Sequence, residues 1–160
     1  MGHWKPGCHP GLPPEIVDGL FTAIFKGLVT VGFKVVIGVT GHDVKEQVDS
    51  LQKAVDAICA DGQATGFAMM EGWLYDLPGD EMDHAGHWET SLLMYLHPEL
   101  VEMDKIKSEV LKTDDDAKAA GIWGRDPRTD SSRALGEKIA KRIADNVGKK
   151  AQELLAGLRH

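Results

Sequence analysis

The sequence predicts an α/β protein with a parallel sheet sandwiched by helices, and three observations support this prediction. An apolar stripe at the 3.6-residue period covers residues 16–29, and a continuous apolar and β-branched run follows at 33–40. A second amphipathic helix at 44–58 then precedes another apolar run at 64–70. Helices that alternate with strands over short connections are typical of a parallel sheet covered by helices.

The boundaries of these elements follow from the residues that flank them. Pro13 and Pro14 suit the first turn of a helix, and Gly32 ends it. The run at 33–40 is of the kind that is buried on both faces of a parallel sheet. Asp61 and Gly62 close the second helix. The apolar stripe of the first helix consists of Ile16, Leu20, Phe21, Ile24, Phe25, Leu28 and Val29.

The C-terminal half is predicted to be helical. An apolar helix over 91–96, with Glu89-Thr90-Ser91 at its start, stops near Pro98. The charged stretch 105–118 is interpreted as a solvated connection. A long last helix has Ser131 or Ser132 as its cap, and we expect it to pack against the sheet. Its apolar stripe is Leu135, Ile139, Ile143, Val147, Ala151 and Leu154.

Length and composition indicate one soluble domain over residues 1–160. The net charge is -7, and Lys and Arg are dispersed, which excludes nucleic acid as an expected partner. No run approaches the roughly 20 apolar residues of a membrane span, and the N-terminus lacks the apolar core of a signal peptide. Cys8 and Cys59 match no metal or redox spacing. These features favour a cytoplasmic location.

His42 follows the first predicted strand directly, in the turn Gly41-His42-Asp43. In open parallel sheets the carboxyl ends of the strands border the ligand crevice, so this position suits a functional residue. A histidine there can equally well cap the next helix. For Asp43 the capping role is favoured.

The stretch DHAGHWETS places two histidines and two carboxylates within residues 83–91. His84 and His87 share a face if the segment is helical, and two imidazoles at this spacing can bind a metal ion. Asp83 and Glu89 can orient a histidine or supply oxygen ligands. Acidic residues also favour a helix N-terminus through the dipole, so a site and a helix start stay equally supported. Tryptophan side chains such as Trp73, Trp88 and Trp123 suit either a pocket or the core.

Four motifs in one order resemble those of the creatininase (creatinine amidohydrolase) family, and they span nearly the whole chain. They are HPGLP at 9–13, VVIGVTGHD at 35–43, DHAGHWETSLLMYLHPELV at 83–101 and GIWGRDPRTDSSRALGEKI at 121–139. The resemblance implies a creatininase-like fold, a two-metal site that holds zinc or manganese, and hydrolysis of an amide or cyclic amide-like bond of a small molecule.

The same resemblance assigns roles to individual residues. His84 matches the catalytic histidine that transfers a proton, and Asp83, which stands where creatininase has Glu, is the second predicted catalytic residue. His42 matches a metal-binding histidine and Glu89 matches the Glu of Glu-Thr-Ser, so both are predicted metal ligands. The residues themselves add two lower-ranked candidate ligands, His87 and Glu46, and two candidate substrate-pocket residues, Trp73 and Trp88.

The chain also departs from the family pattern. Family members carry an earlier Glu-x-His and an Asp that supply much of the metal coordination, whereas this chain has no Glu-x-His and carries Val44 where creatininase has Glu. The ligand set is therefore incomplete, and the chain resembles the C-terminal two-thirds of a family member without the N-terminal strand-helix portion. A non-catalytic, metal-free homologue that serves binding or assembly is the alternative. An uncovered sheet edge or helix face predicts a homo-oligomer, a hexamer by family resemblance.

Overall fold

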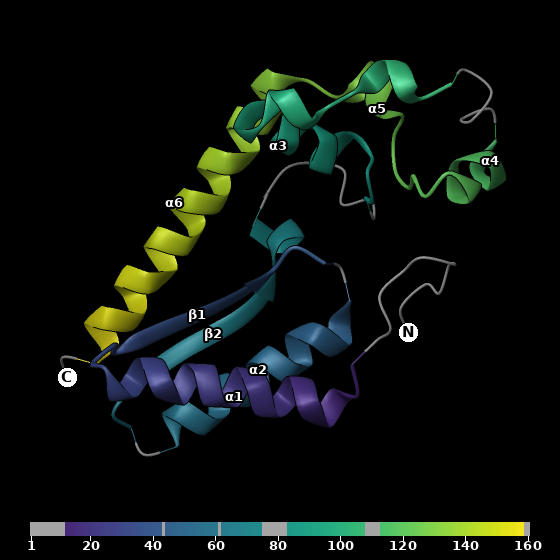
Figure 1. Ribbon diagram of the computed structural model, residues 1–160. Coiled ribbons are helices and arrows are strands. Elements are labelled where there is room, and N and C mark those ends of the chain that lie inside the picture. The colour runs from purple at the N-terminus through teal and green to yellow at the C-terminus, as the bar shows by residue number, and fades with distance from the viewer. Residues whose placement is uncertain (1–11, 43, 61, 75–82, 108–112, 159–160) are drawn as a thin grey trace. The chain divides into compact units, whose positions relative to one another are not determined.

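The computed structural model describes residues 12–42, 44–60, 62–74, 83–107 and 113–158 (Figure 1). The chain divides into two compact units, one of residues 1–71 with 149–160 and the other of residues 72–148. The expectation of one domain over residues 1–160 stays a prediction. No helix among the described residues is long and apolar enough to cross a membrane.

The first unit is built around two parallel strands. Its elements are α1 (Pro14–Thr30), β1 (Val35–Thr40), α2 (Lys45–Cys59), β2 (Thr65–Met70) and the last turns of α6 (Arg133–Gly157). The strands pair in parallel, with Val35 opposite Thr65 and Thr40 opposite Met70. This pairing confirms the predicted α/β class, and the strands begin one or two residues later than the apolar runs indicated (Figure 1).

The core of this unit lies between the sheet and helices α1 and α2. Alternate residues of β1 face the helices, and a Cβ atom at Gly38 would lie 3.1 Å from Leu51 and 3.2 Å from Phe25. The opposite face is less covered, because Val39 is 41% exposed. The expectation that β1 is buried on both faces was therefore wrong at Val39. The buried cluster comprises Phe25, Val36, Leu51, Ala54, Val55, Ile58 and Ala64.

The apolar stripe of α1 divides into two faces. Phe25 is buried, and Phe21, Leu28 and Val29 pack against the core beside it. Three other members of the predicted stripe, Ile16, Leu20 and Ile24, are 52%, 51% and 48% exposed. An apolar stripe in the sequence identifies one side of a helix. In α1 only part of that side contacts α2 and β1, and the rest is exposed.

The second unit is mainly helical. It contains the end of η1 (Glu71–Leu74), then α3 (His87–Leu96), η2 (Pro98–Leu100), η3 (Met103–Lys105), α4 (Asp114–Ala119), α5 (Pro127–Asp130) and the first part of α6. Helix α3 begins at His87, two residues before the predicted start, and ends before Pro98 as predicted. The stretch 105–118 is more than a solvated connection, because Thr113 Oγ1 accepts the backbone N–H of Asp116 and caps α4.

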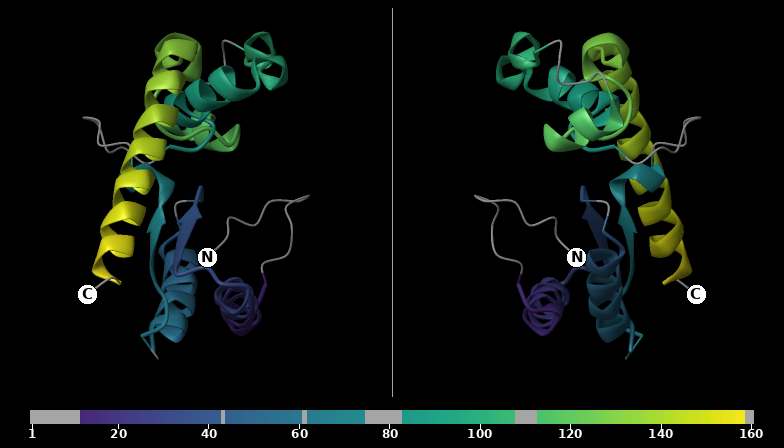
Figure 2. Two further views of the ribbon diagram at one scale, coloured as in Figure 1. Left: turned by 90° about the vertical axis from the view of Figure 1, so that its left-hand side faces the viewer. Right: turned by 90° about the vertical axis from the view of Figure 1, so that its right-hand side faces the viewer.

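Helix α6 begins where the sequence predicts. Ser132 Oγ accepts the backbone N–H of Leu135 at 3.1 Å, which confirms the predicted cap. Ile139 is fully buried against Trp88 of α3. The later turns belong to the first unit, where Lys150 Nζ lies 5.9 Å from the ring centroid of Phe67 on β2. Within the first unit, these last turns thus contact the sheet, as expected (Figure 2).

The short helix α5 makes a pH-dependent contribution that can be tested. Asp126 Oδ1 accepts the backbone N–H of Arg128 at 2.8 Å, and Arg128 Nη2 lies 2.7 Å from Asp126 Oδ2. The hydrogen bonds from the Arg128 side chain hold the pKa of Asp126 below its ordinary value of 3.8. The charged carboxylate therefore stabilises the fold above pH 3.8, and this stabilisation is lost as the pH falls through the lowered pKa.

We expect Asp126→Ala to lower the free energy of unfolding by about 1 kcal/mol at neutral pH, and by progressively less in acid. Urea unfolding of both proteins at about pH 7 and about pH 3 measures this difference. Asp130→Ala in the same helix is the matched control, since among the described residues the Asp130 carboxylate accepts a hydrogen bond only from the neighbouring Thr129 hydroxyl. A cost at Asp126 that is as large in acid as at neutral pH contradicts the role of its charge.

Candidate active site

The backbone of His84 is held by a two-residue bridge to Trp123. The His84 N–H donates to Trp123 O at 3.0 Å, and the Trp123 N–H donates to His84 O at 2.8 Å. The two rings lie with their centroids 5.5 Å apart. The imidazole is nevertheless 52% exposed. The bridge therefore fixes the position of this side chain and leaves its nitrogens accessible to a ligand.

The two residues after His84 adopt a conformation that few sequences allow. Ala85 has φ +50°, in the left-handed region that glycine and asparagine favour. At Gly86, a Cβ atom would overlap Asp83 Oδ1 and would lie 2.5 Å from Trp123 O. Only glycine fits this close approach of three segments. Geometry thus explains the glycine of the motif, whereas Ala85 adopts a conformation that is unfavourable for alanine.

Asp83 lies beneath this loop with its side chain 7% exposed. Its Oδ2 accepts the backbone N–H of Glu89 at 2.9 Å and so satisfies a donor in the first turn of α3. Burial raises the pKa of the Asp83 carboxyl, and the backbone N–H groups of Glu89 and Trp88 oppose this rise. The buried carboxylate thus holds the loop of residues 83–86 against the first turn of α3.

His87 is the interior partner of Asp83. The residue is 3% exposed, and its Nδ1 lies 3.3 Å from Asp83 Oδ1. The imidazole also lies against the indole of Trp88, with ring centroids 4.1 Å apart. Although His84 and His87 are only three residues apart, the first is accessible and the second is enclosed.

Each residue of the Glu-Thr-Ser motif binds a backbone group. Glu89 Oε2 accepts the N–H of Ala85 at 2.7 Å, and Thr90 Oγ1 donates to Ala85 O at 3.2 Å. Ser91 is fully buried, and its Oγ accepts the N–H of Ser132 at 3.0 Å. The motif therefore forms hydrogen bonds with both the N–H and the C=O of Ala85, and it joins α3 to the start of α6.

Helices α3 and α6 cross closely at Gly136. A Cβ atom at this position would overlap Ser91 O and would lie 2.9 Å from Tyr95 Cβ. The crossing explains why a glycine stands inside the first turns of a long helix, where it costs intrinsic helix stability. It also places the cap of α6 beside the candidate loop.

Comparison with known proteins decides the family. The family model of creatininase, described as creatinine amidohydrolase, matches residues 4–150. The chain belongs to the creatininase family. No curated protein sequence gives a significant match.

Solved creatininases share the fold of this chain. A crystal structure of creatinine amidohydrolase (creatininase) has a TM-score of 0.70 and 19% sequence identity, covering 91% of this chain and 66% of that chain. A manganese creatininase has a TM-score of 0.68 and 20% identity, and a creatininase variant of the Zn-Zn type has 0.70 and 21%; each match covers 94% of this chain and 67% of that chain. The chain thus spans about two thirds of the length of these creatininases.

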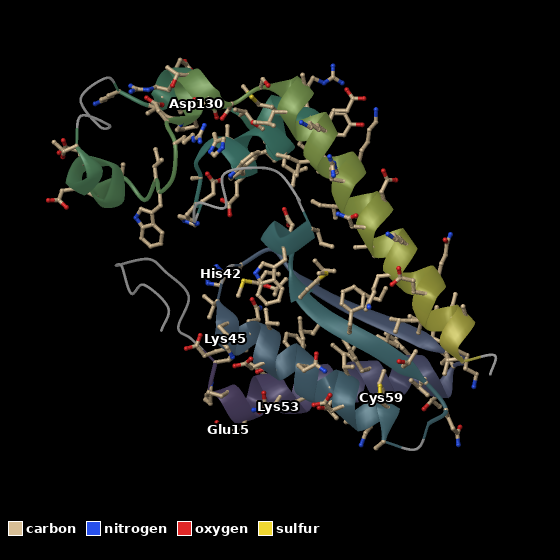
Figure 3. The ribbon with its side chains drawn as sticks, turned by 180° about the vertical axis from the view of Figure 1, so that it is seen from behind. Glu15, His42, Lys45, Lys53, Cys59 and Asp130 are labelled. Atoms are coloured by element: carbon tan, nitrogen blue, oxygen red, sulfur yellow. The ribbon has the colours of Figure 1, made fainter. Side chains whose placement is uncertain are left out.

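The other predicted site residues lie in several places. His42 follows β1 in the first unit, where its backbone N–H donates to Thr40 Oγ1 at 3.0 Å (Figure 3). Glu46 is exposed in the first turn of α2. In the second unit, Trp73 is 60% exposed, whereas Trp88 is buried in the cluster with Ile139. Their roles in a metal site or a substrate pocket stay predictions.

Glu71 is a candidate that sequence reasoning missed. The residue directly follows β2, and its Oε2 lies 3.1 Å from where a Cβ atom on Gly41 would be. Glu71 and the turn before His42 are thus at the same end of the sheet. The signal was present in the sequence, because an acidic residue directly after a strand satisfies the same rule that singled out His42.

The described residues do not form a metal site of the kind that zinc or manganese creatininases imply. Among them, no three His, Cys, Asp or Glu side chains gather where one ion could be held. Glu89 binds the Ala85 N–H and lies 3.9 Å from His84 Nδ1, while His87 is enclosed against Asp83. Since a zinc site uses at least three protein ligands, the donors among the described residues do not fit such an ion.

Proposed function

We propose that this chain acts as a small-molecule amidohydrolase in which His84 transfers a proton. The observation that supports the proposal is the loop geometry, an accessible imidazole on a backbone that Trp123 holds through two hydrogen bonds. Membership of the creatininase family supports the substrate class, an amide or cyclic amide bond of the creatinine type. A solved creatininase variant complexed with creatine supports a small-molecule ligand.

The proposed chemistry needs a group that moves protons. Hydrolysis adds the oxygen of water to the carbonyl carbon, breaks the bond from carbon to nitrogen, and gives a proton to the leaving nitrogen. Imidazole both takes and gives protons near neutral pH, so His84 suits this transfer. The Trp123 ring beside it offers a flat apolar surface. Asp83, the other predicted catalytic residue, has a positioning role in this proposal: through its hydrogen bond with the Glu89 N–H it holds the loop that carries His84.

Dependence on a divalent metal is a separate part of the proposal. It rests on the family resemblance and on the zinc and manganese forms of solved creatininases. His42 and Glu89 stay the proposed ligands, with His87 and Glu46 as secondary candidates. Because the described residues do not complete a ligand set, metal binding requires further donors. We likewise propose a homo-oligomer, as the resemblance implies.

We expect His84→Ala to lower the rate of creatinine hydrolysis by about 100-fold or more, since a positioned general acid contributes at least that factor. The measurement is creatine formation by the full chain supplied with zinc or with manganese. His97→Ala is the matched control, because this histidine is exposed on the same unit and pairs with Glu99 on the surface. A His84→Ala variant that is as active as the wild type contradicts the proposal.

The alternative is a non-catalytic homologue that binds a small molecule or serves assembly. It is motivated by the lack of a three-ligand group among the described residues. Equilibrium dialysis with zinc and calorimetry with creatine separate the two functions. Binding of creatine with no hydrolysis of creatinine under either metal favours the non-catalytic role and rejects the hydrolase.

A further inference from the structure

A polar pair is buried in the second unit, next to the loop that carries His84. The side chains of Asp83 and His87 are only 7% and 4% exposed, and His87 Nδ1 lies 3.3 Å from Asp83 Oδ1. A carboxylate and an imidazole lose hydration when they are buried, and only a polar partner compensates for that loss. The pair therefore does more than fill space in the core.

The two oxygens of Asp83 have different surroundings. Oδ2 accepts the backbone N–H of Glu89. Oδ1 is turned toward Gly86, where an added Cβ atom would overlap it and would also lie 2.5 Å from Trp123 O. A carbonyl oxygen accepts and does not donate, so this side offers Oδ1 no donor. Among the described residues Oδ1 forms no hydrogen bond with a backbone group, and the imidazole of His87 is the side chain beside it.

The imidazole of His87 is itself held by the core of this unit. His87 is the first residue of α3, and its ring lies against the indole of Trp88, with the centroids 4.1 Å apart. Trp88 in turn packs in the buried cluster with Ile139 of α6. The backbone O of His87 accepts the hydroxyl of Ser131 at 3.4 Å. One imidazole therefore connects the packed helices α3 and α6 to the carboxylate of Asp83.

We propose that His87 is a positioning residue, which acts through Asp83 on the loop that presents His84. Its Nδ1–H donates to Asp83 Oδ1 and so keeps Oδ2 directed at the Glu89 N–H. The carboxylate then has one orientation, and residues 83–86 keep the conformation that His84 needs. A reacting group is effective only within a narrow range of positions, and supporting contacts of this kind maintain that range. The effect on catalysis rests on the proposed hydrolase function, whereas the effect on the loop does not.

Two variants of similar shape isolate the donor. His87→Asn keeps an N–H group near the position of Nδ1, whereas His87→Leu has a side chain of about the same size without a donor. In His87→Leu the buried Oδ1 has lost its partner, so Asp83 releases the Glu89 N–H more often. We expect amide hydrogen exchange at Glu89, measured relative to Ile139, to accelerate by about 10-fold or more in His87→Leu. In His87→Asn it should stay close to the wild type.

The kinetics of creatinine hydrolysis provide the second readout. We expect kcat to fall by about 10-fold or more in His87→Leu with KM nearly unchanged, and to recover in His87→Asn. Leu92→Ala is the matched control, because Leu92 packs against the same cluster from α3 and carries no donor. This variant should be less stable than the wild type, yet its kcat and its relative exchange at Glu89 should change little.

The outcomes separate this inference from the proposed function. Unchanged exchange at Glu89 in His87→Leu overturns the inference, and so does an equal acceleration in Leu92→Ala. Equal changes in His87→Asn and His87→Leu also overturn it, because the imidazole would then act by its shape or as a metal ligand. Wild-type kcat in His87→Leu overturns the effect on catalysis. A wild-type chain that does not hydrolyse creatinine with zinc or manganese rejects the proposed function, and the exchange at Glu89 still decides the role of His87.

Discussion

Gly136→Ala is expected to lower the free energy of unfolding by about 3 kcal/mol or more, the upper range for overpacking a closely packed core. The added methyl group would overlap the carbonyl oxygen of Ser91 and press on Tyr95 Cβ, so α3 and α6 must separate at their crossing. This separation also breaks the hydrogen bond between Ser91 and Ser132. Urea unfolding followed by circular dichroism measures the loss.

Gly148→Ala is the matched control on the same helix. A Cβ atom at Gly148 would meet nothing within 4 Å, so only the gain in helix propensity remains. We expect this variant to be more stable than the wild type by up to about 1 kcal/mol. Equal stabilities of the two alanine variants would show that α3 and α6 do not cross as closely as described.

Gly86→Ala is expected to be nearly as damaging, with a loss of about 2 to 3 kcal/mol. Its Cβ atom would overlap Asp83 Oδ1 and lie 2.5 Å from Trp123 O. Either the hydrogen bond from the Glu89 N–H to Asp83 or the backbone bridge between His84 and Trp123 must therefore open. Opening of the bridge exposes the Trp123 N–H, and its amide hydrogen exchange should accelerate. Creatinine hydrolysis, where measured, should fall with it.

Ala85→Gly is the control for the neighbouring position. Ala85 already has φ +50°, which glycine adopts without steric cost, so this variant should match or exceed the wild type in stability. The loop would then tolerate a change of residue at one position and not at the next. A Gly86→Ala variant with wild-type stability and wild-type exchange at Trp123 rules out the close approach.

The elements that the sequence predicted well are those with a strong local pattern. The runs that became β1 and β2, the helix start at Pro13 and Pro14, and the cap at Ser132 depend on neighbouring residues and need no knowledge of the rest of the chain. The exposed residues Ile16, Leu20 and Ile24 could not be distinguished from the buried residues of the same stripe, because apolar periodicity identifies one side of a helix and not how much of that side a neighbour covers.

The sequence likewise predicted some features of the candidate site and not others. The motif around His84 was visible in the sequence, and its loop before α3 was expected. The enclosure of His87 was not, because the same three-residue spacing allows both imidazoles to face one ligand. The link from Ser91 to Ser132 joins residues 41 apart, and no local pattern reports such a pair.

The bridge between His84 and Trp123 has a consequence for the order in which the site forms. Its two sides are separated by a long stretch of chain, as are the contacts of Ser131 and Ser132 with α3, which span 44 and 41 residues. Closing such loops costs entropy before any contact compensates for it, so these pairings form after the local helices. His84 therefore acquires its fixed position late in folding, and residues 83–91 alone contain the motif without the bridge to Trp123 that holds it.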